Sequence, residues 1–484
     1  MNRGKRGIFG GRRRAGVLLH LSSLPHDSYE PGMQRSARHF IDFLYEAGLS
    51  VWQMLPIGPS HNGSPYDLAS SHAGHPVYIS DDPLPAGLPA GLGREEGVAR
   101  LEAAFAFCEE RGQPPELEIF LAEHSGWIDD YALFQTLKAR EGGRPWWEWP
   151  QPLRDHESAA LVPIRASADF RRHRFWQWIF FHQWADLRQY ARNKGVLLFG
   201  DMPFFVAHDS ADVWAHRDLF RLDDQGRPDV VAGVPPDYFS AEGQRWGNPV
   251  YRWDVMARQG FQWWRERLKT QLTLFDLVRI DHFRGLESCW EIPAEAQTAA
   301  AGHWGKAPGE ALLDSLEGLW ANLPVVAEDL GVITDAVIEL RDRHGLAGMK
   351  VLQFAFGDDA RNPYLPHNHV RNAVAYTGTH DNDTTVGWFN GLAPSVQDYV
   401  REYLGAREPM PWALIRAAMA SVADLAVVPM QDLLALDSCY RMNTPGSTRG
   451  NWTYRLSWTD IPDDLALRVR HLTELYDRHR PAAD

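Results

Sequence analysis

The sequence contains few cysteines, no excess of positive charge and no long hydrophobic run. Three of its 484 residues are cysteine, and no two of them have the spacing of a zinc-binding pair. A sparse, odd set argues against a disulfide framework and for a reducing compartment. The net charge of −14 disfavours nucleic acid and anionic membrane surfaces as partners, because both are polyanions. No stretch approaches the roughly 18 apolar residues of a membrane span.

The N-terminus has some features of a signal peptide. Arg12, Arg13 and Arg14 precede a short apolar run that His20 interrupts. This run is too short for the hydrophobic region of a signal peptide, and no cleavage site follows it. We therefore expect a cytoplasmic protein.

Aromatic residues are abundant, at 12% of the chain with 20 tryptophans. They could form a large aromatic core, or they could provide flat surfaces on which sugar rings stack. Composition alone does not choose between these two interpretations. The hydrophobic share of 44% and the charged share of 23% are those of an ordinary globular protein.

Eight short apolar runs alternate with helical patterns along the chain. Several runs are nearly continuous in Val, Leu, Ile and Phe, which is typical of parallel strands covered on both faces. The runs are Gly16–Leu21, Val51–Pro56, Val196–Pro203, Leu277–Phe283, Val325–Asp329, Met349–Phe356, Ala373–His380 and Ala423–Met430. Helical patterns cover Ser36–Ala47, Phe170–Asn193, Gly260–Leu274, Thr334–His344 and Asp463–Arg480. This alternation predicts an α/β fold, a (β/α)8 barrel that occupies residues 1–484 as one catalytic domain.

The spacing between the predicted strands is uneven, so we expect inserted subdomains in the loops after strands 2, 3 and 4. A mainly helical insertion is expected over residues 60–165, and others over 205–258 and 284–322. The segment Asp223–Tyr251 is rich in Gly, Pro, Asp and aromatics, which predicts an extended loop.

Charged residues follow the fourth predicted strand. Arg279 and Asp281 are two residues apart, so both side chains point to the same side of the strand. A neighbouring cation lowers the pKa of a carboxyl group and keeps it ionised, as a nucleophile requires. The alternative is a purely structural ion pair.

Glu328 follows the fifth predicted strand. Three small apolar residues precede it, a setting that raises the pKa of a carboxyl group by desolvation. A carboxylic acid that stays neutral at pH 7 can donate a proton to a leaving group. The alternative is that Asp329 caps a helix and that Glu328 is merely its neighbour.

Polar residues also end the seventh and third predicted strands. The run Thr377–Thr384 contains His380 and Asp381 and suits the recognition of sugar hydroxyl groups, but a turn with a helix cap would look the same. Asp201, after strand three, is weak evidence by itself. Together, Asp281, Glu328 and Asp381 form the pattern of an α-glycosidase site, because two carboxyl groups of unlike pKa carry out glycoside chemistry.

With these residues in place, the sequence resembles the 4-α-glucanotransferases, which are called amylomaltase or disproportionating enzyme. These enzymes form glycoside hydrolase family 77, within the α-amylase clan. The resemblance runs along the whole chain in a fixed order of short motifs. They are GVLLHLSSLP (16–25), WQMLPIGP (52–59), GDMPFFVA (200–207), GVPPDYF (233–239), QRWGNPVY (244–251), RIDHFRG (279–285), AEDLG (327–331) and GTHDNDTT (378–385).

The resemblance implies a role for each matching residue. Asp281 would be the nucleophile, Glu328 the general acid and then base, and Asp381 would hold sugar hydroxyl groups at the donor subsite. The same donor sugar would contact Arg279, His380, Asp201 and Tyr66. On the acceptor side, over which 205–258 would lie, the expected residues are Trp246, Tyr238 and Phe239. Ser64 and Asn443 are fainter candidates for hydroxyl contacts. Trp176, Trp178 and Trp184 are assigned to packing.

The reaction expected from the resemblance is retaining transfer of an α-1,4-glucan segment to the 4-hydroxyl of another glucan. It implies carboxyl groups about 5–5.5 Å apart. No metal or other cofactor is expected in this chemistry. The expected partners are α-1,4-glucans and maltooligosaccharides, with the chain a monomer or a weak homo-oligomer. Two alternatives remain: an α-glucan hydrolase of the same clan, and a non-catalytic glucan-binding protein. Products formed from maltotriose would separate transfer from hydrolysis.

Overall fold

A computed structural model describes residues 9, 11–25, 34–80, 84–85, 88, 98–236, 242–320, 322–405, 408–447 and 449–479. Eight parallel strands form its central sheet, with the strand order β10-β11-β12-β1-β2-β3-β6-β9. The strands are β1 (Arg14–Leu18), β2 (Val51–Gln53), β3 (Leu197–Met202), β6 (Leu277–Ile280), β9 (Val325–Ala327), β10 (Gly348–Val351), β11 (Ala373–Tyr376) and β12 (Leu425–Pro429). Each of the eight predicted runs overlaps one of these strands; β1 begins two residues before its run and β10 one residue before.

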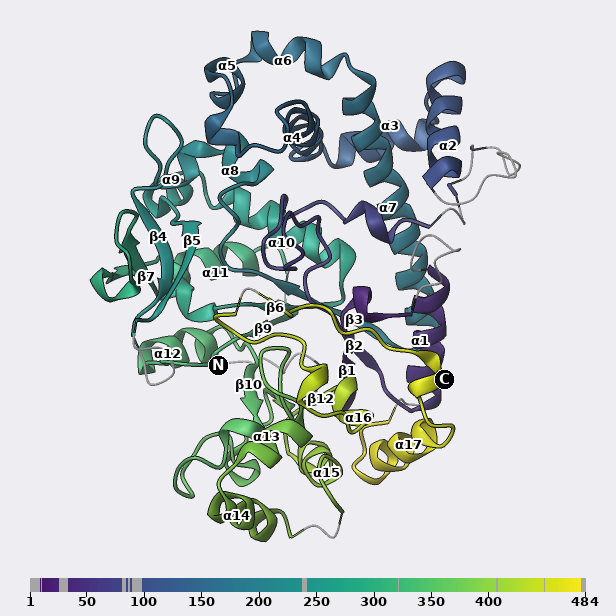
Figure 1. The fold of residues 1–484 in the computed structure, drawn as a ribbon, viewed down its shortest axis with the longest axis vertical. Helices are drawn as coiled ribbons and strands as arrows, with labels where there is room; N and C mark the ends of the chain where they lie inside the picture. Colours follow the sequence, from purple (N-terminus) through teal and green to yellow (C-terminus); the bar gives the residue numbers. More distant parts are fainter. Residues whose placement is uncertain are drawn as a thin grey trace.

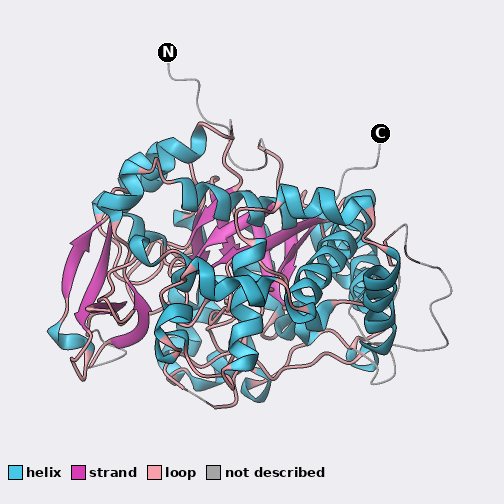
Figure 2. Cartoon of the chain, turned by 90° about the horizontal axis from the view of Figure 1, so that it is seen from above, coloured by secondary structure: helices cyan, strands magenta, loops and turns pink. Residues whose placement is uncertain are grey.

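The two edges of this sheet meet. Val326 of β9 forms a parallel bridge with Ala347, which directly precedes β10, and the Ala327 amide donates to the Ala347 carbonyl at 2.8 Å. The sheet is therefore nearly closed into a (β/α)8 barrel, as predicted. Figure 2 shows the strands in the centre with helices around them.

Helices return the chain between the barrel strands. They are α1 (Gln34–Glu46), α7 (Ala168–Asn193), α10 (Gln262–Leu274), α11 (Gly309–Glu317), α12 (Asp335–Arg343), α13 (Thr385–Gly391), α14 (Pro394–Leu404), α15 (Trp412–Ala420), α16 (Met430–Leu433) and α17 (Leu465–Leu475). The long helix α7 begins where the Ser167 side chain accepts a hydrogen bond from the Phe170 amide. Its Trp178 and Trp184 are buried in the main core, which confirms their assignment to packing.

Helices also fill the segment between β2 and α7, at the top of Figure 1. They are α2 (Val98–Arg111), α3 (Pro115–Glu123), α4 (Ile128–Arg140), α5 (Gln151–Arg154) and α6 (Ser158–Arg165). The core is continuous from the barrel into this segment, because Phe134 and Trp146 belong to the same buried cluster as the strand residues.

A second, four-stranded antiparallel sheet lies beside the barrel, in the order β5-β4-β7-β8 (Figure 1, left). Its strands are β4 (Val230–Val234), β5 (Gln244–Pro249), β7 (Ser288–Pro293) and β8 (His303–Lys306); the short helices α8 (Ala211–Ala215) and α9 (Trp253–Arg258) flank the first pair. The prediction of an extended loop over Asp223–Tyr251 is therefore wrong. The strands β4 and β5 form there because β7, from the segment after β6, pairs with β4 and buries Val231 and Ile292. A partner so distant in sequence leaves no local signal.

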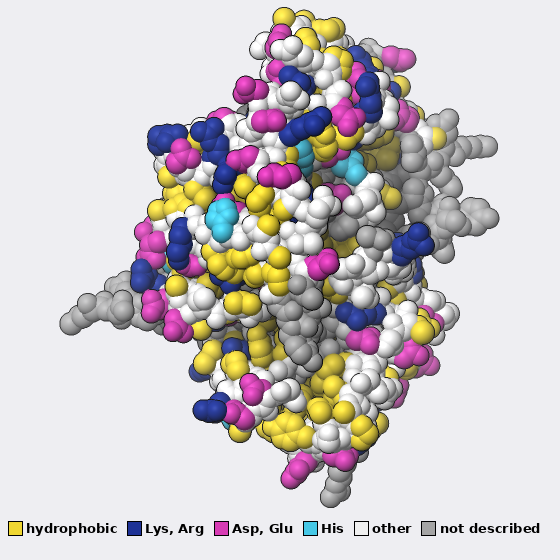
Figure 3. All heavy atoms as spheres, turned by 60° about the vertical axis from the view of Figure 1, so that its left-hand side comes forward, with side chains coloured by type: hydrophobic (Ala, Val, Ile, Leu, Met, Phe, Trp, Pro, Cys, Tyr) yellow, Lys and Arg dark blue, Asp and Glu magenta, His cyan; other side chains and the backbone are white. Residues whose placement is uncertain are grey.

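The surface carries charges of both signs. On the face shown in Figure 3, acidic and basic side chains are interspersed among hydrophobic ones over the described residues. None of the helices in the described part of the chain has the length and apolar character needed to cross a membrane.

Candidate active site

Polar side chains meet where β3, β6, β9 and β11 end. In the parallel register Asp201 of β3 lies beside Arg279 of β6, and Ile280 of β6 lies beside Ala327 of β9. Asp281 and Glu328 each follow one of these last two residues, so both stand at the carboxyl edge of neighbouring strands. This is the face on which barrel enzymes build their active sites.

Arg279 is the centre of the cluster and is only 3% exposed. Its Nε donates to Asp201 Oδ1 at 3.0 Å, and its Nη2 donates to Asp281 Oδ1 at 2.5 Å. The contact between Arg279 and Asp281 confirms that both side chains point to the same side of β6. A guanidinium that serves two carboxylates orients both of them.

Arg279 lowers the pKa of Asp281, as expected, but the net shift of that pKa is upward. Desolvation raises the pKa of Asp281 to about 6, and the attraction of Arg279 offsets only part of that rise. The nearby carboxylates Asp201 and Asp381 raise it further. At pH 7 Asp281 is nevertheless mostly ionised.

Glu328 has a pKa raised to about 8, first by desolvation and second by the negative charge of Asp281. This confirms the effect expected from its apolar surroundings. Backbone amides hold the carboxyl group: His282 N donates to Oε2 at 2.8 Å, and Leu330 N donates to Oε1 at 3.2 Å. His282 has a left-handed backbone with φ of 51°, which is uncommon for a residue other than glycine. Glu328 is thus protonated and fixed in position at pH 7.

Tyr66 and His380 lie next to Arg279 and Asp201. The Tyr66 hydroxyl donates to Asp201 Oδ2 at 2.7 Å and lies 2.9 Å from His380 Nε2. The two rings are stacked at 5.4 Å between centroids. Ser64 supports the Tyr66 loop, because its Oγ accepts the Tyr66 amide at 3.3 Å. Both oxygens of Asp201 are occupied by these neighbours, so a direct contact from Asp201 to a sugar stays a prediction.

Asp381 is the most open carboxylate of the cluster, with 47% of its side chain exposed. Asn443 Nδ2 donates to Asp381 Oδ1 at 2.6 Å, and His380 Nε2 lies 3.4 Å from the same oxygen. Arg441 Nη2 donates to the Asp381 carbonyl at 2.6 Å. Among the described residues, none donates a hydrogen bond to the second carboxylate oxygen of Asp381.

Trp246 lies on β5 of the second sheet, next to His282. Its indole meets the His282 ring edge-on, with 4.9 Å between centroids, and 40% of the residue is exposed. The second sheet therefore brings an aromatic surface next to the residue that follows Asp281. Tyr238 and Phe239, predicted on the same side, lie outside the described residues.

Two residues at the site were not singled out from the sequence. The backbone amide of His282 holds Glu328, and the ring of His282 contacts Trp246. His282 therefore joins the carboxyl groups of the site to the aromatic side chain on the second sheet. Trp452 lies beside Tyr66 and His380, at 5.9 and 6.0 Å between centroids. His282 stands inside the RIDHFRG motif, and that position was the one available signal.

The fold and the cluster of carboxyl groups at its strand ends define a class: a barrel enzyme equipped for glycoside chemistry. Comparisons with known proteins specify it further. The model of glycoside hydrolase family 77, described as 4-alpha-glucanotransferase, matches residues 19–460. The chain belongs to this family, and it is a glucanotransferase whose substrates are α-glucans.

The similarity to individual relatives extends over nearly the whole chain. The 4-alpha-glucanotransferase of Thermus thermophilus is 48% identical, over 96% of this chain and 99% of its own length. That of Synechocystis is 44% identical, over 96% and 98%. The structure of amylomaltase from Streptococcus agalactiae in complex with acarbose superposes with a TM-score of 0.90 at 34% identity, covering 97% of this chain and all of the other. The hydrolase and the non-catalytic alternatives are not favoured.

Proposed function

We propose that the chain transfers α-1,4-glucan segments between maltooligosaccharides by a retaining double displacement, with Asp281 as nucleophile and Glu328 as acid and base. The observation that carries this proposal is the pair of unlike pKa values. Burial raises the pKa of Asp281 to about 6 and that of Glu328, which also feels the charge of Asp281, to about 8, so at pH 7 one carboxyl group is charged while its neighbour still holds a proton. Retaining glycoside chemistry requires this division of states.

In the first step Asp281 attacks the anomeric carbon while the glycosidic bond breaks. The leaving oxygen takes the proton of Glu328, so the first product departs as a neutral alcohol and Glu328 becomes a carboxylate. A β-linked glycosyl ester on Asp281 remains. Arg279 holds the Asp281 carboxylate in place through the hydrogen bond of 2.5 Å to Oδ1.

In the second step the 4-hydroxyl of an acceptor glucan attacks the ester from the side that the first product has left. Glu328 accepts the hydroxyl proton, and Asp281 leaves as a carboxylate. Two inversions restore the α configuration, and both carboxyl groups return to their starting states. A separation of about 5–5.5 Å between the two carboxyl groups belongs to this mechanism and stays a prediction.

The donor sugar is proposed to bind over the side of the cluster that Asp381 opens. Asp381 accepts sugar hydroxyl groups with the support of Asn443 and His380. Tyr66 stacks beneath the ring, and its hydroxyl contact with Asp201 fixes the orientation of the aromatic plane. Ser64 supports the position of Tyr66, because its Oγ accepts a hydrogen bond from the Tyr66 amide.

Trp246 is proposed to bind the acceptor. Water is abundant, so a sugar competes with it only if binding raises the occupancy of the acceptor site and removes water from it. An exposed indole next to His282 offers a flat surface for that purpose. Tyr238 and Phe239 would add to it, and a monomer or weak homo-oligomer suffices for the chemistry.

A mechanism-based label tests this assignment. Incubation with 5-fluoro-α-glucosyl fluoride, followed by digestion and mass spectrometry, should locate the sugar on the peptide that contains Asp281. Labelling of another carboxyl group would overturn the proposal. Chromatography of the products from maltotriose should show glucose together with saccharides longer than the substrate; shortening alone would mean hydrolysis.

A further inference from the structure

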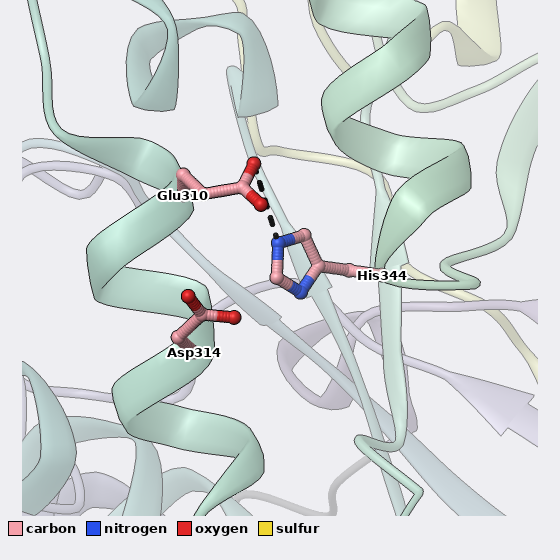
Figure 4. A group of neighbouring side chains, drawn as sticks. All are labelled: Glu310, Asp314 and His344. Atoms are coloured by element: carbon pink, nitrogen blue, oxygen red, sulfur yellow. Dashed lines mark ion pairs between the residues drawn. The ribbon is translucent and has the colours of Figure 1, made fainter.

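Three potential metal ligands converge on the outer helices, away from the proposed active site. Glu310 and Asp314 are four residues apart on α11, so they project from one face of that helix. His344 directly follows α12 and reaches toward both (Figure 4). One ligand atom from each of the three residues lies within 4.8 Å of the others.

The histidine carries the argument. His344 is 5% exposed, and within the described part of the chain its buried Nε2 has no hydrogen-bond partner; Glu310 Oε2 lies 3.8 Å away. Its Nδ1 lies 2.9 Å from Glu317 Oε1. Because an ionised carboxylate only accepts hydrogen bonds, Nδ1 carries a proton, and Nε2 can bind a metal ion through its lone pair once it holds no proton. A buried polar atom without a hydrogen-bond partner is costly, and here Nε2 lies beside the Glu310 carboxylate.

This arrangement of the histidine and its carboxylate neighbours is typical of a metal site. A histidine that binds a metal through one ring nitrogen typically donates the other N–H to a carboxylate, which fixes its tautomer and orientation. Glu317 occupies that supporting position, and Glu310 and Asp314 supply negative charge close to the imidazole ring.

We propose that Glu310, Asp314 and His344 bind a divalent transition-metal ion of the zinc class, with water completing the coordination. The imidazole favours Zn²⁺, Co²⁺ or Ni²⁺, whereas Ca²⁺ and Mg²⁺ prefer sites made only of oxygen. Arg343 now pairs with Glu310 at 2.9 Å from a side chain that is 60% exposed, so it can turn into solvent when the ion takes over its charge.

The topology gives the ion a structural role. Barrel helices run back from the carboxyl ends of the strands, so His344, at the end of α12, lies toward the opposite end of the barrel from Asp281 and Glu328. The ion joins α11 to α12, the two helices that flank β9 in sequence. It therefore stabilises the fold and takes no part in glycoside chemistry.

The experiment uses the full chain after treatment with a chelator. Titration with Co²⁺ should show one tight site per chain and a visible absorption band from nitrogen and oxygen ligands, and Zn²⁺ should displace the Co²⁺. His344→Ala should abolish this site. Asp314→Ala, a change at an exposed position, should weaken it at least tenfold without unfolding the chain. Glu317→Gln should weaken it about tenfold, because it alters only the support of the histidine.

Glu402→Ala, which removes an exposed acid from α14, is the matched control and should bind Co²⁺ like the unchanged chain. Anomalous diffraction from Zn²⁺-soaked crystals should place the ion between Glu310, Asp314 and His344. Equal affinity in the unchanged chain and in Asp314→Ala would overturn the proposal, as would an anomalous peak only elsewhere. Zn²⁺ should also raise the unfolding temperature of the unchanged chain but not that of His344→Ala.

Discussion

The two sides of the proposed cleft are built differently. On the donor side, Tyr66, Asp201, Arg279 and Asp281 are joined by hydrogen bonds of 2.5–3.0 Å, and the arginine at their centre is almost fully buried. On the acceptor side, Trp246 projects from the second sheet and is 40% exposed. One side is a fixed network within the barrel, and the other is an open aromatic surface.

This difference matches the demands of a transfer reaction. The donor sugar must be held in one geometry while a covalent bond forms, and preorganised groups in a desolvated site stabilise the transition state best. The acceptor side must release one glucan and admit another during each turnover. An exposed indole binds by stacking and lets the sugar leave without breaking a network of hydrogen bonds.

Loss of the nucleophile should have the largest effect. Asp281→Ala should lower transfer by about 10⁴-fold or more, because no other group can form the ester. Steady-state rates with maltotriose measure this loss. With α-glucosyl fluoride and added azide, the variant should form the β-glucosyl azide. Recovery of an α-linked product would contradict the assignment.

Loss of the acid should come next and should depend on the leaving group. Glu328→Gln should lower transfer from maltotriose by about 10²–10⁴-fold, the usual range for general acid catalysis. Cleavage of an α-glucosyl fluoride, which needs no proton, should be spared. If both substrates lose rate equally, Glu328 is not the acid.

The pH dependence follows from the two carboxyl groups. Asp281 must be ionised, so kcat/KM should fall below its pKa of about 6. Glu328 must be protonated, so kcat/KM should also fall above its pKa of about 8. The profile should be a bell with its maximum between these values, and each limb should lose about tenfold per pH unit. In Glu328→Gln, assayed with the fluoride, the alkaline limb should disappear and the acid limb should remain.

A contact at the rim of the fixed network should matter less. Asn443→Ala removes the hydrogen bond of 2.6 Å to Asp381 and should lower kcat/KM about tenfold, as expected for a bond to a charged group. Asn451→Ala is the matched control, since among the described residues the Asn451 side-chain amide bonds to Thr444 and Ser447 of its own loop. An equal loss in both variants would show that loop structure, rather than Asp381, is responsible.

The smallest change in rate is expected on the open side. Trp246→Ala should leave cleavage within a few-fold of normal but raise the share of hydrolysis, because stacking on one aromatic surface contributes roughly 1 kcal/mol. The products from maltotriose give the ratio of transfer to hydrolysis. Trp304→Ala is the control: Trp304 lies on β8 of the same sheet and is 39% exposed. A ratio that stays constant in Trp246→Ala would contradict the acceptor assignment.

The donor side could largely be predicted from the sequence, and the acceptor side could not. Asp281 and Glu328 directly follow strongly apolar strands, Asp381 comes five residues after the last residue of β11, and strand ends of a barrel share one face. Trp246 reaches the site on a sheet whose strands come from two separate segments, one after β3 and one after β6. The sequence of Asp223–Tyr251 alone resembles a loop, because its pairing partner β7 begins only at Ser288.

The amino-acid sequence by itself determined the barrel, its eight strands and the acids at their ends, because local hydrophobic patterns and strand alternation encode these features. Tertiary structure alone decided how the acids titrate. Burial outweighs the attraction between Arg279 and Asp281, and the His282 amide fixes Glu328. The same holds for Nε2 of His344, which lies beside the Glu310 carboxylate only because α11 and α12 pack together. Desolvation and contacts between distant segments depend on the whole fold, and no short stretch of sequence specifies them.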